Sequence, residues 1–135
     1  MKVLIVGSGG REHAIAYALS KSKKVSEIHA IPGNPGIASI GTCHKGSVED
    51  LQGILAFVEE NGIDFTVIGP EVPLCMGLAD LLESKGHKVT YLGFKNQIEE
   101  KLISNEELVL IPNIKTNMDS WVSYLAFIFD FNFSS

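Results

Sequence analysis

The sequence predicts an α/β fold: an open, parallel, Rossmann-like sheet of about four strands with helices on both faces. Three observations carry this prediction. The chain opens with four consecutive aliphatic residues, 3–6, which suit a parallel strand covered on both faces. Strand-like and helix-like segments then alternate, as right-handed βαβ crossovers require. Each of the first three strand-like segments is followed at once by glycine or proline residues.

The strands are expected where short, mostly apolar runs lie between turn signals, at 2–6, 27–31, 64–68 and 88–92. After the first strand, four apolar residues at helical spacing predict a helix: Ala14, Ile15, Ala18 and Leu19. The second helix begins at the capping-box-like Ser47-x-x-Asp50 and ends at Asn61-Gly62. A third helix is expected from Pro73 to the stop at Lys85-Gly86.

Three turns, at 7–10, 32–36 and 69–70, each follow a predicted strand. In an open parallel sheet, ligands bind beyond the carboxyl ends of the strands. We therefore expect the three turns to converge on one ligand crevice.

Composition limits the classes of partner. The chain of 135 residues has 11 basic and 16 acidic residues and a net charge of −5, which argues against general nucleic-acid binding. No segment has the ~20 apolar residues that a membrane span needs, and the apolar run at the start is too short for a signal peptide. Cys43 and Cys75 form no C-x-x-C motif, which favours free thiols in a reducing cytosol. We expect a cytoplasmic protein that binds neither nucleic acid nor membranes.

The first turn predicts an anion site. Gly9 and Gly10 leave backbone N–H groups uncovered, and the helix that follows brings a partial positive charge to the same place. Arg11 adds a cation there, which is favourable when an anion is bound. Glu12 has two interpretations that stay open: a residue of the ligand site, or an acid that complements the helix end.

The other two turns add polar groups. Pro32-Gly33-Asn34-Pro35-Gly36 suits a stiff loop that presents backbone groups and the Asn34 amide to a ligand. Glu71 lies between a strand end and a helix start, where its carboxylate can accept hydrogen bonds from sugar hydroxyls or an amine. A plain helix-capping role for Glu71 stays open.

Several other sites are disfavoured. A dinucleotide site requires a third glycine where Glu12 stands, and an acidic residue after the second strand, which ends Ala30-Ile31-Pro32. The Walker pattern is absent. Cys43-His44 has no second pair at metal-ligand spacing, so no metal site is expected. His13 is interpreted as a packing residue near the site, and no catalytic group is predicted.

Three motifs, in order and at compatible spacings, closely resemble the N-terminal domain of the phosphoribosylamine–glycine ligase (glycinamide ribonucleotide synthetase) family. They are Gly7-Ser8-Gly9-Gly10-Arg11-Glu12-His13-Ala14, Pro32-Gly33-Asn34-Pro35-Gly36-Ile37-Ala38 and Val67-Ile68-Gly69-Pro70-Glu71-x-Pro73-Leu74. The resemblance runs from Met1 to about Leu92. It implies an ATP-dependent ligase of purine biosynthesis, in the ATP-grasp superfamily, that joins phosphoribosylamine and glycine to form glycinamide ribonucleotide.

The resemblance also implies a division of labour. The N-terminal, pre-ATP-grasp domain helps to hold the phosphoribosyl substrate, whereas ATP and Mg²⁺ or Mn²⁺ are held mostly by the later ATP-grasp domain. The motifs imply these substrate-binding residues: Gly9, Gly10, Arg11, Glu12, Gly33, Asn34 and Glu71. The resemblance implies that the residues from Gly9 to Glu12 lie near the 5′-phosphate. Gly33 and Asn34 are implied along the same crevice, and Glu71 is implied to face the ribose or the amine.

Residues 93–135 depart from the family. Gly93-Phe94-Lys95 stands where the family has Gly-Pro and a helix with a Ser-Lys pair, and a Phe-rich run at 121–133 follows. We expect residues 1–92 to be the substrate-binding domain and 93–135 a divergent tail without an ATP-grasp domain, as a truncated or frame-disrupted gene would produce. The isolated chain is expected to be inactive. The alternative is a stand-alone, non-catalytic module that binds a phosphoribosyl compound.

Overall fold

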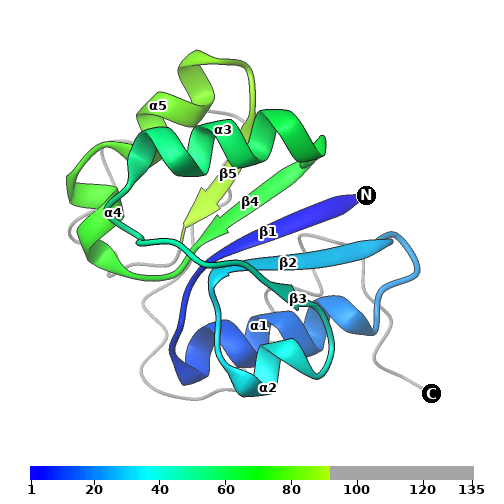
Figure 1. Cartoon of the computed structure of the whole chain (residues 1–135). Helices are drawn as coiled ribbons and strands as arrows, with labels where there is room; N and C mark the ends of the chain where they lie inside the picture. The colour runs from blue at the N-terminus through cyan, green and yellow to red at the C-terminus, as the bar shows by residue number, and fades with distance from the viewer. Residues whose placement is uncertain (92–135) are drawn as a thin grey trace.

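The fold is organised around β1 (Lys2–Gly7), whose residues Val3–Val6 have no exposed surface. Such a strand needs cover on both faces, and the computed structural model, which describes residues 1–91, provides it. β2 (Glu27–Pro32) and β4 (Phe65–Ile68) pair with the two edges of β1. β3 (Thr42–Cys43) and β5 (Lys88–Tyr91) complete a parallel sheet in the order β3-β2-β1-β4-β5 (Figure 1).

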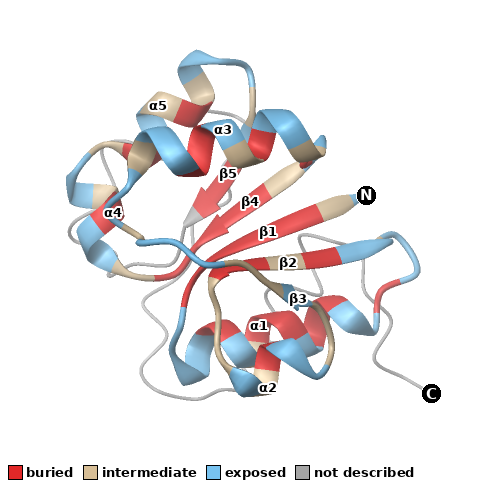
Figure 2. Ribbon diagram, in the orientation of Figure 1, coloured by how far each residue is buried: buried red, intermediate tan, exposed pale blue. Residues whose placement is uncertain are grey.

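Helices cover both faces of the sheet. α1 (Gly10–Ser20) and α2 (Pro35–Ala38) lie on one face, and α3 (Leu51–Asn61), α4 (Glu71–Cys75) and α5 (Leu78–Ser84) lie on the other (Figure 1). Alternate residues of β1 point into the two cores, Val3 and Ile5 toward α1 and Leu4 and Val6 toward α3 and α5. Figure 2 shows the buried residues following the strands and the inner sides of the helices.

The predicted fold class is confirmed. Each of the four expected strands is present with its ends within one residue of the prediction, apart from residue 92, which lies outside the described residues along with the predicted tail 93–135. The fifth strand, β3, was not expected. It has two residues, too few for a pattern in the sequence, and its pairing with His29 and Ala30 identifies it.

Two helix predictions need correction. The expected third helix is two helices, α4 and α5, because Gly77 adopts a φ of +94° between them and a left-handed residue ends a helix. The second helix starts later than Ser47. Its N-cap is Asp50, whose Oδ1 accepts a hydrogen bond from Gly53 N at 3.0 Å. Its predicted end is confirmed, since Gly62 follows the helix with a φ of +61°.

Candidate functional site

The carboxyl ends of β1, β2 and β4 bring the three glycine turns together at one edge of the sheet. The turns are neighbours because β1 lies between β2 and β4. Backbone hydrogen bonds continue past the strand ends, from Gly33 N to Gly7 O at 3.0 Å and from Gly69 N to Val6 O at 3.0 Å. The predicted convergence of the three turns is therefore present in the structure.

Glu12 is buried at this edge, with 5% of its surface exposed. It lies in the first turn of α1, and its Oε2 accepts a hydrogen bond from Gly9 N at 2.6 Å. Gly9, the N-cap of α1, has no side chain of its own to cap the helix, so Glu12 satisfies this N–H from inside the helix. This bond is the contact that an acid complementing the start of the helix makes.

Asn34 connects two of the turns. Its Oδ1 accepts a hydrogen bond from Ile37 N at 2.9 Å, which makes it the N-cap of α2. Its Nδ2 donates to the carbonyl oxygens of Ser8, at 3.0 Å, and Gly9, at 3.3 Å. The expected stiff loop therefore contains a short helix, and the Asn34 amide holds that loop against the turn after β1.

Two close approaches explain glycines in the second turn. Gly33 has a φ of +73°, and the Sγ of Cys43 occupies the space that a Cβ would need there. At Gly36, a Cβ would lie 2.6 Å from the Nδ1 of His13. The ring of His13 therefore lies against Gly36 at the start of α2, although His13 itself is exposed rather than packed in the core.

Arg11 and Glu71 are the exposed charged members of the predicted set. Arg11 is in the first turn of α1, and Glu71 is the first residue of α4. A Cβ on Gly10 would meet no atom of the described residues within 4 Å, so the start of α1 is open. The first bond of α1 runs from His13 N to Gly9 O at 3.1 Å, so the N–H groups of 10–12 have no acceptor within the helix. This edge therefore offers backbone donors and a guanidinium to an anion.

A cluster on the α3 face was missed by the sequence reasoning. His29 Nδ1 lies 2.9 Å from His44 Nε2, and His29 Nε2 lies 2.9 Å from Glu27 Oε2. Phe57 contacts both imidazole rings. Burial lowers the pKa of His44, and the adjacent His29 lowers that pKa further. The hydrogen bond from His29 is the main cause that lowers the pKa of Glu27. The two histidines are 15 residues apart, and only the pairing of β3 with β2 indicates their contact.

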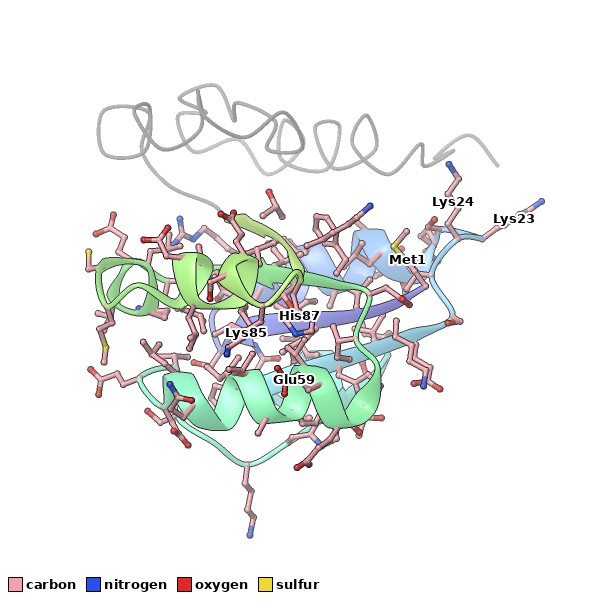
Figure 3. All side chains as sticks on the ribbon, turned by 90° about the horizontal axis from the view of Figure 1, so that it is seen from above. Met1, Lys23, Lys24, Glu59, Lys85 and His87 are labelled. Atoms are coloured by element: carbon pink, nitrogen blue, oxygen red, sulfur yellow. The ribbon has the colours of Figure 1, made fainter. Side chains whose placement is uncertain are left out.

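The surroundings of Cys43 and His87 bear on whether a metal could bind. Cys43 Sγ donates to Asn34 O at 3.5 Å, whereas its neighbour His44 contacts His29, so the two side chains diverge. His87 Nε2 is buried 3.6 Å from Glu59 Oε1 (Figure 3). Within residues 1–91, no three His, Cys, Asp or Glu side chains gather as metal ligands would. None of the helices described in that range is long and apolar enough to cross a membrane.

Comparison with known proteins agrees with the resemblance in the motifs. A model of the family described as "Phosphoribosylglycinamide synthetase, N domain" matches residues 1–97. The phosphoribosylamine–glycine ligase of Agrobacterium fabrum is 52% identical over 86 residues, which are 64% of this chain and 20% of that protein. The enzyme of the same name from Caldanaerobacter subterraneus is 47% identical over 89 residues, 66% of this chain and 21% of that protein.

The crystal structure of phosphoribosylamine–glycine ligase from Thermotoga maritima is 38% identical, with a TM-score of 0.43, over 54% of this chain and 16% of that one. The chain spans about a fifth of the length of the two bacterial ligases to which it is compared. The family model covers well over half of the chain, and on that match the chain belongs to the phosphoribosylglycinamide synthetase N-domain family.

Proposed function

We propose that this chain is the N-terminal part of an ATP-dependent ligase that joins phosphoribosylamine and glycine to form glycinamide ribonucleotide. Its share of the reaction is to hold the phosphoribosyl substrate. Membership of the N-domain family and the names of the relatives support the reaction. The observation that carries the binding role is the meeting of three glycine turns at one edge, with Arg11 and Glu71 exposed there.

In this proposal, the 5′-phosphate binds at the start of α1. The N–H groups there have no acceptor within the helix, and the helix dipole favours negative charge. Arg11 gives the phosphate a charge-assisted hydrogen bond. Gly10 keeps the approach open, and Gly9 and Gly33 form the backbone around it. Glu71 accepts hydrogen bonds from the ribose hydroxyls or the amine of the substrate.

ATP and Mg²⁺ or Mn²⁺ belong, in this proposal, to the part of the ligase beyond this domain. The described residues do not fit a metal, because their potential ligands do not gather in groups of three. Residues 1–92 form the substrate-binding domain and 93–135 the divergent tail of a cytoplasmic protein whose partners are small molecules rather than nucleic acid or membranes.

Calorimetric titration of the full chain tests the binding role. Glycinamide ribonucleotide, ATP and NAD are titrated in parallel, and we expect heat of binding with the ribonucleotide alone. Binding of NAD in place of the ribonucleotide would show that the edge holds a dinucleotide. Absence of binding to all three would contradict the proposed role of the domain.

Two variants locate the ligand. Arg11→Ala removes a charge-assisted hydrogen bond, so the affinity for glycinamide ribonucleotide should fall about 10- to 150-fold, equivalent to about 1.5–3 kcal/mol. The matched control is Lys23→Ala, which removes an exposed cation beyond the opposite end of α1 (Figure 3).

Glu71→Gln should weaken binding even of an analogue without the phosphate, and Glu60→Gln on α3 is its control. An equal loss in a variant and its control would place the ligand elsewhere.

We also propose that the chain by itself does not make glycinamide ribonucleotide. Much of an enzyme's advantage comes from orienting its reactants, and the chain spans only about a fifth of the length of its relatives. The assay measures phosphate release with ATP, Mg²⁺, glycine and phosphoribosylamine, after contaminating ligase has been removed. Release that depends on both glycine and phosphoribosylamine would overturn this part of the proposal.

A further inference from the structure

The side chain of Glu12 fills the space between two turns that are far apart in the sequence. At the end of β1, where the first turn begins, a Cβ on Gly7 would lie 2.6 Å from Glu12 Cγ. In the turn after β4, a Cβ on Gly69 would lie 2.5 Å from Glu12 Cδ, and closer still to its Oε1. Real Cβ atoms do not approach other atoms so closely, so both glycines leave room for the same carboxylate.

The carboxylate is also committed to the backbone. Its Oε2 accepts the Gly9 N–H at 2.6 Å, and the residue is 5% exposed. Burial of a carboxylate is costly unless hydrogen bonds and favourable charge offset the loss of water. Here the Gly9 N–H and the amino-terminal end of α1 provide that compensation. Because the Gly9 N–H is already hydrogen-bonded to Glu12, a phosphate that binds at the start of α1 must bond to the backbone N–H groups of the residues after Gly9.

We propose that Glu12 is a positioning residue, which holds the turn after β1 at a fixed distance from the turn after β4, and does not itself contact the substrate. This inference rests on the proposed function for its link to the substrate. In that setting, Glu12 sets the spacing between the start of α1, which carries Arg11, and the start of α4, which carries Glu71. It assigns Glu12 a different role from the ligand contact that the motif implied.

A double-mutant cycle tests the contact between the turns without any ligand. Gly69 does not have a left-handed φ, so alanine there is limited by Glu12 rather than by the backbone. Gly69→Ala should raise the unfolded fraction of the full chain at least about tenfold, measured by urea unfolding. In a Glu12→Ala background, the same substitution should change that fraction less than about threefold. Gly10→Ala is the control, because a Cβ there meets nothing within 4 Å among the described residues and helix propensity favours alanine. Equal effects of Gly69→Ala in both backgrounds would overturn the inference.

Calorimetry with glycinamide ribonucleotide then separates positioning from contact, on chains shown by circular dichroism to be folded. Glu12→Ala should weaken binding about tenfold or more, whereas Glu12→Gln should stay within about threefold of the parent, because its amide oxygen can still accept the Gly9 N–H. Loss of binding in both variants would mean that the charge contacts the ligand. Full binding in both would mean a structural role alone. Either result would overturn the inference. If the parent chain binds no ribonucleotide, the proposed function fails, and the cycle alone decides whether Glu12 holds the turns.

Discussion

The two ends of the sheet are held together in different ways. At the carboxyl ends of the strands, side chains fill the space beside glycines, as Cys43 does at Gly33 and Glu12 at Gly69. At the amino ends, the chain is joined by exposed polar contacts, such as Lys2 N donating to Asp64 Oδ2 at 2.7 Å. The first end combines steric fit beside glycines with the hydrogen bonds of Asn34, whereas the bond from Lys2 at the second end has only its own competition with water to overcome. Substitutions should therefore cost more at the carboxyl end, where the ligand is proposed to bind.

The largest expected effect is at Gly33. Gly33→Ala forces a Cβ onto a left-handed residue and into the Sγ of Cys43, so we expect a loss of about 2–5 kcal/mol in the free energy of unfolding. Gly62→Ala is the matched control, because Gly62 has a φ of +61° and open space around it among the described residues. That variant should lose only about 1–2 kcal/mol. Urea unfolding measures both, and equal losses would show that steric fit at the carboxyl end adds nothing.

A smaller effect is expected from Asn34→Ala, at about 1–3 kcal/mol, because the N-cap of α2 and the bonds to the Ser8 and Gly9 carbonyls are lost together. Asn34→Asp keeps the oxygen that caps α2 and removes the NH₂ donor. Its stability should lie between those of the parent and the alanine variant. An aspartate variant as stable as the parent would mean that the connection between the two turns contributes nothing.

At the amino end, Asp64→Ala should lower the free energy of unfolding by only about 0.5 kcal/mol, because a single exposed hydrogen bond, from Lys2 N, is lost. Asp64→Asn retains an acceptor oxygen and serves as the control. If Asp64→Ala lost more free energy of unfolding than Asn34→Ala in the same urea assay, the comparison between the two ends would be reversed.

The smallest effect concerns pH and involves the cluster of Glu27, His29 and His44 at the pairing of β2 with β3. The pKa of His44 is lowered in the folded chain, so the unfolded chain takes up the proton first as the pH falls below the ordinary histidine value of 6.5. The lowered pKa of Glu27 has the same sign, and its contribution is lost below the ordinary value of 4.5. These two groups should therefore leave the free energy of unfolding unchanged above neutrality and lower it in acid. His44→Asn should flatten the upper part of this decrease, from about pH 7 to 5.5 in urea unfolding, and an unchanged slope there would contradict the assignment.

The sequence predicted the parts of the fold that have a repeating pattern. The run 3–6 identifies a strand that is covered on both faces, and apolar spacing identifies α1 and α3. The break between α4 and α5 was missed because apolar periodicity continues across Gly77, and an isolated glycine within a periodic run does not by itself fix a helix end. The two-residue strand β3 was missed because it is too short to show any period.

For the candidate site, residue type predicted location better than role. The motifs place Arg11, Glu12, Asn34 and Glu71 at one end of the sheet, and all four lie there. Which polar groups bond to the protein's own backbone depends on distances across the turns, and these distances arise only when β1, β2 and β4 are aligned. Glu12 and Asn34 bond to the backbone, whereas Arg11 and Glu71 are exposed.

The central place of β1 also has a consequence for synthesis on the ribosome. Its partner on one side starts at Glu27 and its partner on the other side at Phe65, so one edge of β1 is paired well before the other. Because the ribosome adds roughly 5–20 residues per second, the second edge of β1 stays unpaired for seconds. During that interval, the uncharged run 3–6 presents an open edge that neighbouring nascent chains can join. The four residues at the centre of the finished sheet are therefore open to aggregation while the chain is unfinished.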